Sequence, residues 1–356
     1  MVKLYHMATL TDAATVSRKV FKVFVIFASF FLAVILFLTF GKSIRDQIFP
    51  PGAPPPTVAF GKLPEMDLSG GIKPPLAATY TIETISGDLP ALPQSTKIFE
   101  VEPEKVQFGD LERAKKSADR AGFTGEPEQI APSKVRFTDP QNPQRKLTIE
   151  TSTGNLELES NWQNNLKILT EKIRNEQDAL DKARDFFLAF GLSRNEYPDK
   201  NVKLIKYRVD AGKLVEVQAI SQANLIKIVY KRSDLDKLPI LPERENEDTI
   251  WALVSNRDVV AASLSNLRIQ RFKFATYPLK GVTKAFEDLR TQKAAFIKQD
   301  FPANSKNNLI IRKVSLSYIE SRNKQSFLQP VYLFTGDNFI AYVPAVSDAW
   351  VAIEKP

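Results

Sequence analysis

The stretch KLTIETSTGNLELES, residues 146–160, indicates the fold class of this chain. Leu147 and Ile149 alternate with polar residues, and Leu156 and Leu158 resume the alternation after the turn sequence STGN. Alternation with a period of two is typical of a strand with one buried face, and two such runs joined by a short turn predict a β-hairpin. We therefore expect an antiparallel sheet here.

Helical patterns separate this hairpin from further strand-like runs. Apolar residues recur at three- and four-residue spacing in 110–123, 170–192 and 281–297, and Gly122 and Gly191 stand where the first two patterns end. Strand-like runs outnumber the helical ones, and the connections are too short for parallel crossovers. The sequence therefore predicts an α+β fold of antiparallel sheets with about three helices packed on them, in repeated helix-plus-strands units.

The N-terminal region is of a different kind. Residues 23–40 read VFVIFASFFLAVILFLTF, in which fourteen of eighteen residues are Val, Phe, Ile or Leu. A helix from Val20 to Phe40 would be roughly 32 Å long, enough to cross the hydrocarbon core of a bilayer. The run is longer than the apolar core of a signal peptide and no small-x-small site follows it, which favours an uncleaved signal-anchor. More cations precede the run than follow it, so we expect a cytoplasmic N-terminus and an extracytoplasmic C-terminal domain at the cell membrane.

These features predict five segments. They are a cytoplasmic N-terminus (1–19), a single-pass transmembrane helix in contact with the lipid bilayer (20–41), a proline-rich stalk or linker (42–95), a first α+β region (96–231) and a second α+β region (232–356). Ten of the 23 prolines lie between Pro50 and Pro93. Proline favours an extended path, so a disordered spacer is the main expectation for the stalk. A proline-rich ligand for a partner is one alternative, which the expected topology disfavours because such partners are mostly cytosolic. A further alternative is that apolar residues of this segment, such as Leu63, lie along the folded domain.

Composition excludes several classes of function. Cysteine is absent and the only histidine is His6, so the rest of the chain lacks thiolates, the usual zinc ligands and the commonest general base. The formal charge is +8, but residues 1–45 hold six basic residues and one acidic residue, which leaves 43 basic and 40 acidic residues elsewhere. That near balance argues against a nucleic-acid partner. No glycine-rich phosphate-binding motif is present. We expect no catalytic residues, no metal and no cofactor.

Two groups of carboxylates have alternative interpretations. Glu157 and Glu159 are two residues apart and share one face of a strand, where they could form an acid/base pair or a solvated outer face. The alternation with Leu156 and Leu158 favours the solvated face. LPERENEDT, residues 241–249, is acidic but has no glycine for a calcium loop, so a solvated loop is favoured.

The aromatic residues supply the remaining candidates. Trp162, Trp251 and Trp350 could line a ligand groove, but packing in the core of an antiparallel sheet is the favoured interpretation. Pro330 predicts an edge strand or a bulge in LQPVY, where a partner strand could add. The expected recognition surface consists of aromatic residues on the C-terminal strands, namely Tyr318, Tyr332, Phe334 and Tyr342.

Four C-terminal stretches carry a resemblance to known families. They are TYPLKGVTKAFEDLRTQKA (276–294), VSLSYIE (314–320), FLQPVYLFTGD (327–337) and YVPAV (342–346). Together with the single anchor, they resemble the PepSY-like domains of bacterial extracytoplasmic proteins and the membrane-anchored regulators of YycH and YycI type. The resemblance implies helix-plus-antiparallel-strand units that bind partners or restrain proteases and kinases, and it transfers no catalytic residue.

The sequence thus predicts a protein that is not an enzyme and that binds another envelope or membrane protein, or the cell envelope itself. A regulatory role is included in this expectation. Two alternatives remain open at this stage, namely a cell-envelope hydrolase that uses carboxylates alone and a purely structural envelope component.

Overall fold

The computed structural model describes residues 21, 22, 24, 27, 29, 31, 55–75, 78–103, 107–265, 267–302, 308–321 and 323–352. The chain divides into two units, Met1–Pro55 and Pro56–Pro356. The expected transmembrane helix lies largely outside the described residues. No helix in the described part of the chain has both the length and the hydropathy needed to cross a bilayer. The anchor and its orientation therefore stay predictions.

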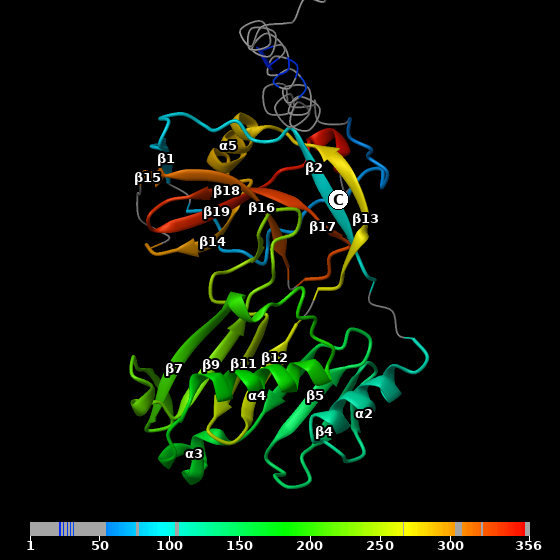
Figure 1. Cartoon of the computed structure of the whole chain (residues 1–356), viewed down its shortest axis with the longest axis vertical. Helices are drawn as coiled ribbons and strands as arrows, with labels where there is room; N and C mark the ends of the chain where they lie inside the picture. Colours follow the sequence, from blue (N-terminus) through cyan, green and yellow to red (C-terminus); the bar gives the residue numbers. More distant parts are fainter. Residues whose placement is uncertain are drawn as a thin grey trace, which may run out of the picture. The chain divides into compact units, whose positions relative to one another are not determined.

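The largest element of the second unit is a nine-stranded antiparallel sheet (Figure 1). Its strand order is β3 (Glu128–Ala131), β4 (Lys134–Thr138), β5 (Lys146–Glu150), β6 (Leu156–Glu159), β12 (Val259–Leu264), β11 (Ile250–Ser255), β9 (Leu225–Tyr230), β7 (Val202–Asp210) and β8 (Lys213–Glu216). The predicted hairpin is present as β5 and β6, with Leu147 opposite Leu158. Strands β11 and β12 come from the region 232–356, so the expected division along the sequence does not separate the sheets.

Two helices cover one face of this sheet. Helix α2 (Asp110–Arg120) and helix α4 (Glu176–Ala189) contribute Ala118, Ala183 and Phe187 to a core shared with the strands. Figure 1 shows α4 running across the strands and α2 beside β4. Gly122 and Gly191 follow the two helices at φ 89° and 81°, a backbone conformation that glycine adopts without strain. The predicted helix ends are therefore confirmed.

The other face of the nine-stranded sheet has only a partial cover. Helix α3 (Leu166–Thr170) packs Ile168 against Leu225, Leu253 and Val260. The 3₁₀ turn Trp162–Asn164 precedes this helix. Beyond these elements, the strand residues that point to this face are polar and exposed on β6, as the burial pattern of Leu156–Glu159 shows. This incompletely covered face is called the open face below.

Three smaller sheets complete the second unit. A five-stranded sheet has the order β10 (Ile240–Pro242), β16 (Lys313–Glu320), β18 (Pro330–Thr335), β19 (Phe339–Pro344) and β14 (Ala295–Gln299). A three-stranded sheet contains β13 (Ile269–Pro278), β2 (Ser95–Val101) and β17 (Phe327–Leu328), and β1 (Thr79–Ile82) pairs with β15 (Asn308–Ile311). Helix α5 (Val282–Arg290) packs on the five-stranded sheet. The α+β class with several antiparallel sheets is confirmed.

Three details differ from the sequence expectation. The pairs β1–β15 and β10–β16 are parallel, because their members lie far apart in the chain and need no direct crossover. The helix expected over 170–192 is interrupted at Asn175, whose backbone is extended. The side chain of Asn175 accepts a hydrogen bond from the backbone N–H of Gln177 and so caps the start of α4. The helix expected to reach residue 297 stops at Arg290, because the following residues pair with β19 as strand β14.

Part of the expected stalk lies along the folded unit. Leu63 is fully buried, and its backbone N–H donates to the carbonyl of Trp350 at 2.8 Å. Val58 donates to the carbonyl of Thr276 at 3.0 Å, and Ile72 bridges to Phe296. The spacer expectation is therefore wrong for residues 58–72, and the alternative that this segment packs on the domain is confirmed. Burial of apolar side chains outweighs the preference of the nearby prolines for an isolated extended path.

A buried ion pair connects the nine-stranded and five-stranded sheets. Arg232 follows β9 and has a side chain that is 3% exposed, with Nη1 3.5 Å from Oε2 of Glu320 at the end of β16. Nη2 of Arg232 donates to the carbonyl of Leu267 at 2.7 Å, while the backbone N–H of Leu267 donates to Glu320 at 3.2 Å. Burial raises the pKa of Glu320 above the usual carboxyl range, and the positive charge of Arg232 opposes that shift.

Candidate functional site

The expected recognition surface is buried. Tyr318, Tyr332, Phe334 and Tyr342 are all between 0% and 1% exposed. Both faces of the five-stranded sheet are covered, so Phe334 packs against α5 while Tyr342 packs in a separate cluster on the other face. The buried hydroxyl of Tyr318 donates a hydrogen bond to the backbone carbonyl of Lys97 at 2.8 Å. These side chains build the core, and the expectation that they contact a partner is wrong for this structure.

Pro330 and the acidic loop also differ from expectation. Pro330 opens β18, a central strand between β16 and β19. A proline is tolerated at the first residue of a strand, so it marks neither an edge nor a bulge here. In the loop 241–249, Glu243 is 2% exposed and therefore not solvated, whereas Glu245 pairs with Lys298 at 3.3 Å. The described residues contain no group of three or more acidic or histidine side chains placed to hold a metal ion.

Two of the three tryptophans lie together on the open face. Trp162 and Trp251 are 89 residues apart in the sequence, yet they line one shallow groove together with Glu157 and Glu159. Trp350 is elsewhere, with its ring centroid 6.1 Å from that of Tyr277 in an edge-on contact. The groove interpretation is therefore supported for Trp162 and Trp251, while core packing holds for Trp350.

The register of the sheet explains the shape of this groove. Glu157 lies directly opposite Ser263 of β12, and Ser263 lies directly opposite Trp251 of β11. Neighbouring strands are about 4.8 Å apart, so the backbones of Glu157 and Trp251 are separated by about 10 Å. The residues of β12 that point to this face, Ala261 and Ser263, are small. The result is a trough one strand wide, with carboxylates on one wall and an indole on the other.

A β-bulge shapes the end of the trough. The pairing of β11 with β12 shifts by one residue, which leaves Val260 as an extra residue in β12. The hydroxyl of Ser160 donates to the carbonyl of Val260 at 2.6 Å, and Nε of Arg145 donates to the carbonyl of Val259 at 3.3 Å. Two polar side chains therefore fix the bulge beside the groove.

The indole of Trp251 is positioned by a cation. Nζ of Lys227 lies 5.1 Å from the centre of the Trp251 ring and 2.6 Å from Oδ2 of Asp248. A lysine held over an indole face is attracted by the ring quadrupole, and its ion pair with Asp248 keeps the ammonium in place. This arrangement restricts the motion of the aromatic wall.

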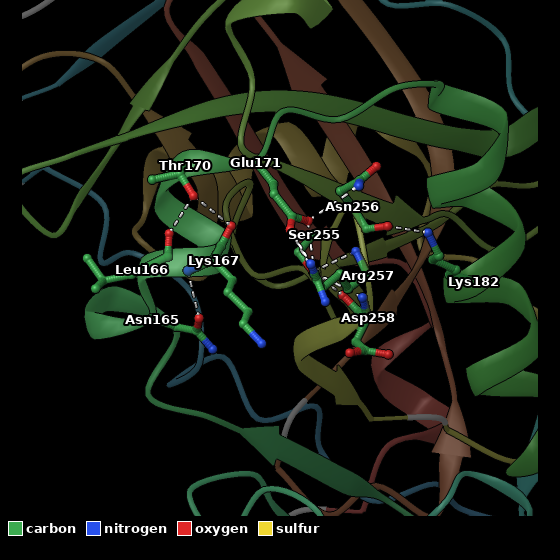
Figure 2. A network of polar contacts seen from close by, with 10 residues as sticks. All are labelled: Asn165, Leu166, Lys167, Thr170, Glu171, Lys182, Ser255, Asn256, Arg257 and Asp258. Atoms are coloured by element: carbon green, nitrogen blue, oxygen red, sulfur yellow. Dashed lines mark hydrogen bonds and ion pairs between the residues drawn. The ribbon is translucent and has the colours of Figure 1, made fainter.

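Polar contacts attach the segment that follows Trp162 to the sheet (Figure 2). Asn165 caps helix α3 by accepting a hydrogen bond from the backbone N–H of Lys167 at 3.1 Å. The carboxylate of Glu171, just after the helix, accepts hydrogen bonds from both Nε and Nη2 of Arg257, which lies in the turn between β11 and β12. These hydrogen bonds hold the pKa of the Glu171 carboxyl below its usual range. Figure 2 also shows Lys182 of α4 reaching the Asn256 carbonyl of the same turn, at 2.7 Å.

A buried amide makes the second attachment of this segment. Asn224 is 1% exposed, and its Nδ2 donates to the carbonyls of Leu169 and Glu171 at 2.9 and 3.1 Å. Its Oδ1 accepts from the backbone N–H of Val209 at 3.2 Å. The segment that carries Trp162 is thereby tied to the sheet at two points.

The charges along the trough are mixed. Glu157 and Glu159 are exposed, as the sequence pattern predicted, and Lys146 lies directly across from Glu159 on β5. The remaining polar side chains of the groove belong to Gln144, Ser160, Asn161 and Gln163. Sequence reasoning identified the tryptophans and the glutamates separately. Lys146, Ala261 and the amides had no sequence signal, because only the strand register brings them together.

Comparisons with known proteins add no assignment. No protein-family model matches the chain, and no curated protein matches it significantly. Among solved structures, an uncharacterised protein from Eubacterium rectale matches with a TM-score of 0.35 and 11% sequence identity, over 70% of this chain and 82% of that chain. A structural similarity of this size carries no argument about function.

Proposed function

We propose that this chain is a membrane-anchored, extracytoplasmic binding protein and that the trough on the open face is its contact site. The apolar run at 23–40 and the excess of cations before it support the anchor and its direction. The resemblance to PepSY-like and YycH–YycI-type regulators is consistent with a role exercised by contact. The partner proposed is the cell envelope or another envelope protein.

One observation carries this proposal. Two partly exposed tryptophans from distant parts of the chain line the same groove, on a sheet face that the helices leave incompletely covered. Exposed tryptophan offers a large apolar area with a polar N–H, and it is enriched where proteins bind ligands and partners. The ion pair and amide contacts of the Trp162 segment hold the groove in shape before any partner arrives.

Hydrolysis by the two carboxylates is less well supported. Glu157 and Glu159 project from one strand toward the same side. Glycosidases need two carboxyl groups that flank the scissile bond from different sides, one of them kept protonated by its environment. Binding is therefore the better interpretation of the same residues.

Photo-crosslinking in living cells tests the proposal. A photoreactive amino acid placed at Gln163, an exposed residue of the groove, should give a covalent adduct with an envelope component. The matched control is Lys116, which is exposed on helix α2 and therefore belongs to the opposite side of the sheet. Equal adducts from both positions, or none from Gln163, would contradict the assignment of the groove.

Protease treatment of intact cells tests the topology separately. We expect the second unit to be digested from outside while the N-terminus stays protected. Full protection of the second unit would overturn the proposed orientation.

A further inference from the structure

We propose that the trough binds a glycan, namely an extended chain of β-linked pyranose rings. This inference rests on the proposed function, since it names the occupant of the same groove. Three features of the trough carry it. They are its two unlike walls, its mixture of hydrogen-bond donors and acceptors, and its floor of small residues on β12.

The unlike walls match the two kinds of surface on a pyranose. A β-linked ring with equatorial hydroxyls has flat faces of C–H groups and a rim of hydroxyls. In the trough, the indole of Trp251 offers an apolar flat wall, while Glu157 and Glu159 on β6 offer acceptors for hydroxyls. The separation of about 10 Å between the strand backbones of β6 and β11 leaves room for one ring between these walls once the side chains are counted.

The mixture of polar groups favours hydroxyls over a cation. Hydroxyls both donate and accept, so they can use the carboxylates of Glu157 and Glu159, the ammonium of Lys146 and the amides of Asn161 and Gln163 together. A lysine or arginine side chain of a basic peptide only donates. It would leave the donors of Lys146 and the amides unused, and it would be repelled by Lys146. The lining is therefore less suited to a basic peptide.

The floor and the far end of the trough favour an extended chain. Ala261 and Ser263 are the small residues of β12 between the two walls, and the bulge at Val260 marks the end of this stretch. Trp162 lies on the 3₁₀ turn that leads into helix α3, and the Glu171–Arg257 pair attaches the end of that helix to the sheet. A second sugar ring can stack on this second indole. Because both indoles are held before binding, little conformational entropy is lost on complex formation.

Titration of the full chain in detergent tests the inference. The probes are the β-1,4-linked hexamer of N-acetylglucosamine and cellohexaose, and the readout is tryptophan fluorescence in a Trp350→Phe background. We expect a saturable change with at least one hexamer. Trp162→Ala should weaken binding at least tenfold, since it removes one stacking surface. Glu157→Gln with Glu159→Gln alters only exposed side chains and should weaken it about three- to tenfold.

Several results would overturn the inference. These are no saturable response to either hexamer, an unchanged affinity in both variants, or saturable binding of hexalysine with no response to the sugars. If crosslinking from Gln163 nevertheless captures an envelope protein, the groove remains a binding site and only its glycan specificity is lost. If both experiments are negative, the proposed function fails with it.

Discussion

Replacement of Arg232 by methionine should strongly destabilise the second unit of this chain. The guanidinium is 3% exposed and lies 3.5 Å from Glu320, which is itself buried at the end of β16. Methionine fills much of the volume of the arginine stem but carries no charge. The variant therefore leaves the Glu320 carboxylate in the interior without its cation.

The magnitude follows from what remains around Glu320. Removal of one partner from a buried ion pair typically costs about 3–5 kcal/mol. Glu320 keeps one hydrogen bond from the backbone N–H of Leu267 at 3.2 Å, and it can take up a proton because burial already raises its pKa. Both effects reduce the loss, so we expect a decrease in the free energy of unfolding of about 3 kcal/mol at pH 7. The double variant Arg232→Met with Glu320→Leu removes both charges and should recover most of that loss.

Urea denaturation of the full chain in detergent measures these differences. The two single variants and the double variant form a cycle, and we expect a coupling energy of about 2–3 kcal/mol. A loss below about 1 kcal/mol for Arg232→Met, or a double variant as unstable as the sum of the single ones, would refute the idea that this pair is coupled in the interior.

Three further predictions concern the same junction, the Trp162 segment and the N-terminal part of the second unit. Burial raises the pKa of Glu320 in the folded state, so the contribution of this carboxyl to stability is present below its usual pKa of 4.5 and is lost as pH rises through the folded-state pKa. Glu320→Gln should therefore flatten the dependence of the urea midpoint on pH between pH 4 and 8. An unchanged slope would contradict the assignment. Asn224→Ala should lower the free energy of unfolding by about 2–3 kcal/mol, because the partly buried carbonyls of Leu169 and Glu171 lose the donor that the buried Asn224 supplies. A loss below about 0.5 kcal/mol would argue against this attachment. Leu63→Ala should lower the free energy of unfolding by about 2–4 kcal/mol in the same assay, because Leu63 is fully buried. The control Leu166→Ala, at a position 75% exposed, should change the free energy of unfolding by less than about 0.5 kcal/mol. Equal effects would mean that residues 58–72 do not pack as described.

The outcome for the aromatic residues shows where sequence reasoning stops. Tyr318 and Tyr342 stand on strands whose alternation is visible in the sequence, but the sequence does not show that both faces of that sheet are covered. For Trp162 and Trp251, the sequence favoured core packing over a groove, and the structure supports the groove. What separates the two pairs is the arrangement of other elements. Helix α5 and the extended segment around Leu68 cover the two faces of the five-stranded sheet, whereas α3 covers only part of the face of the nine-stranded sheet that carries the tryptophans.

Local features of this chain were determined by the sequence alone. The β5–β6 hairpin, the ends of α2 and α4 at Gly122 and Gly191, and the exposed side of Glu157 and Glu159 depend on residues a few positions apart. Such short-range preferences act through backbone geometry and the periodicity of burial, which a single sequence displays. The trough itself was decided only by the tertiary structure. Its walls and floor come from β6, β12 and β11, and strand register, which depends on long-range pairing, places Glu157, Ser263 and Trp251 in one row.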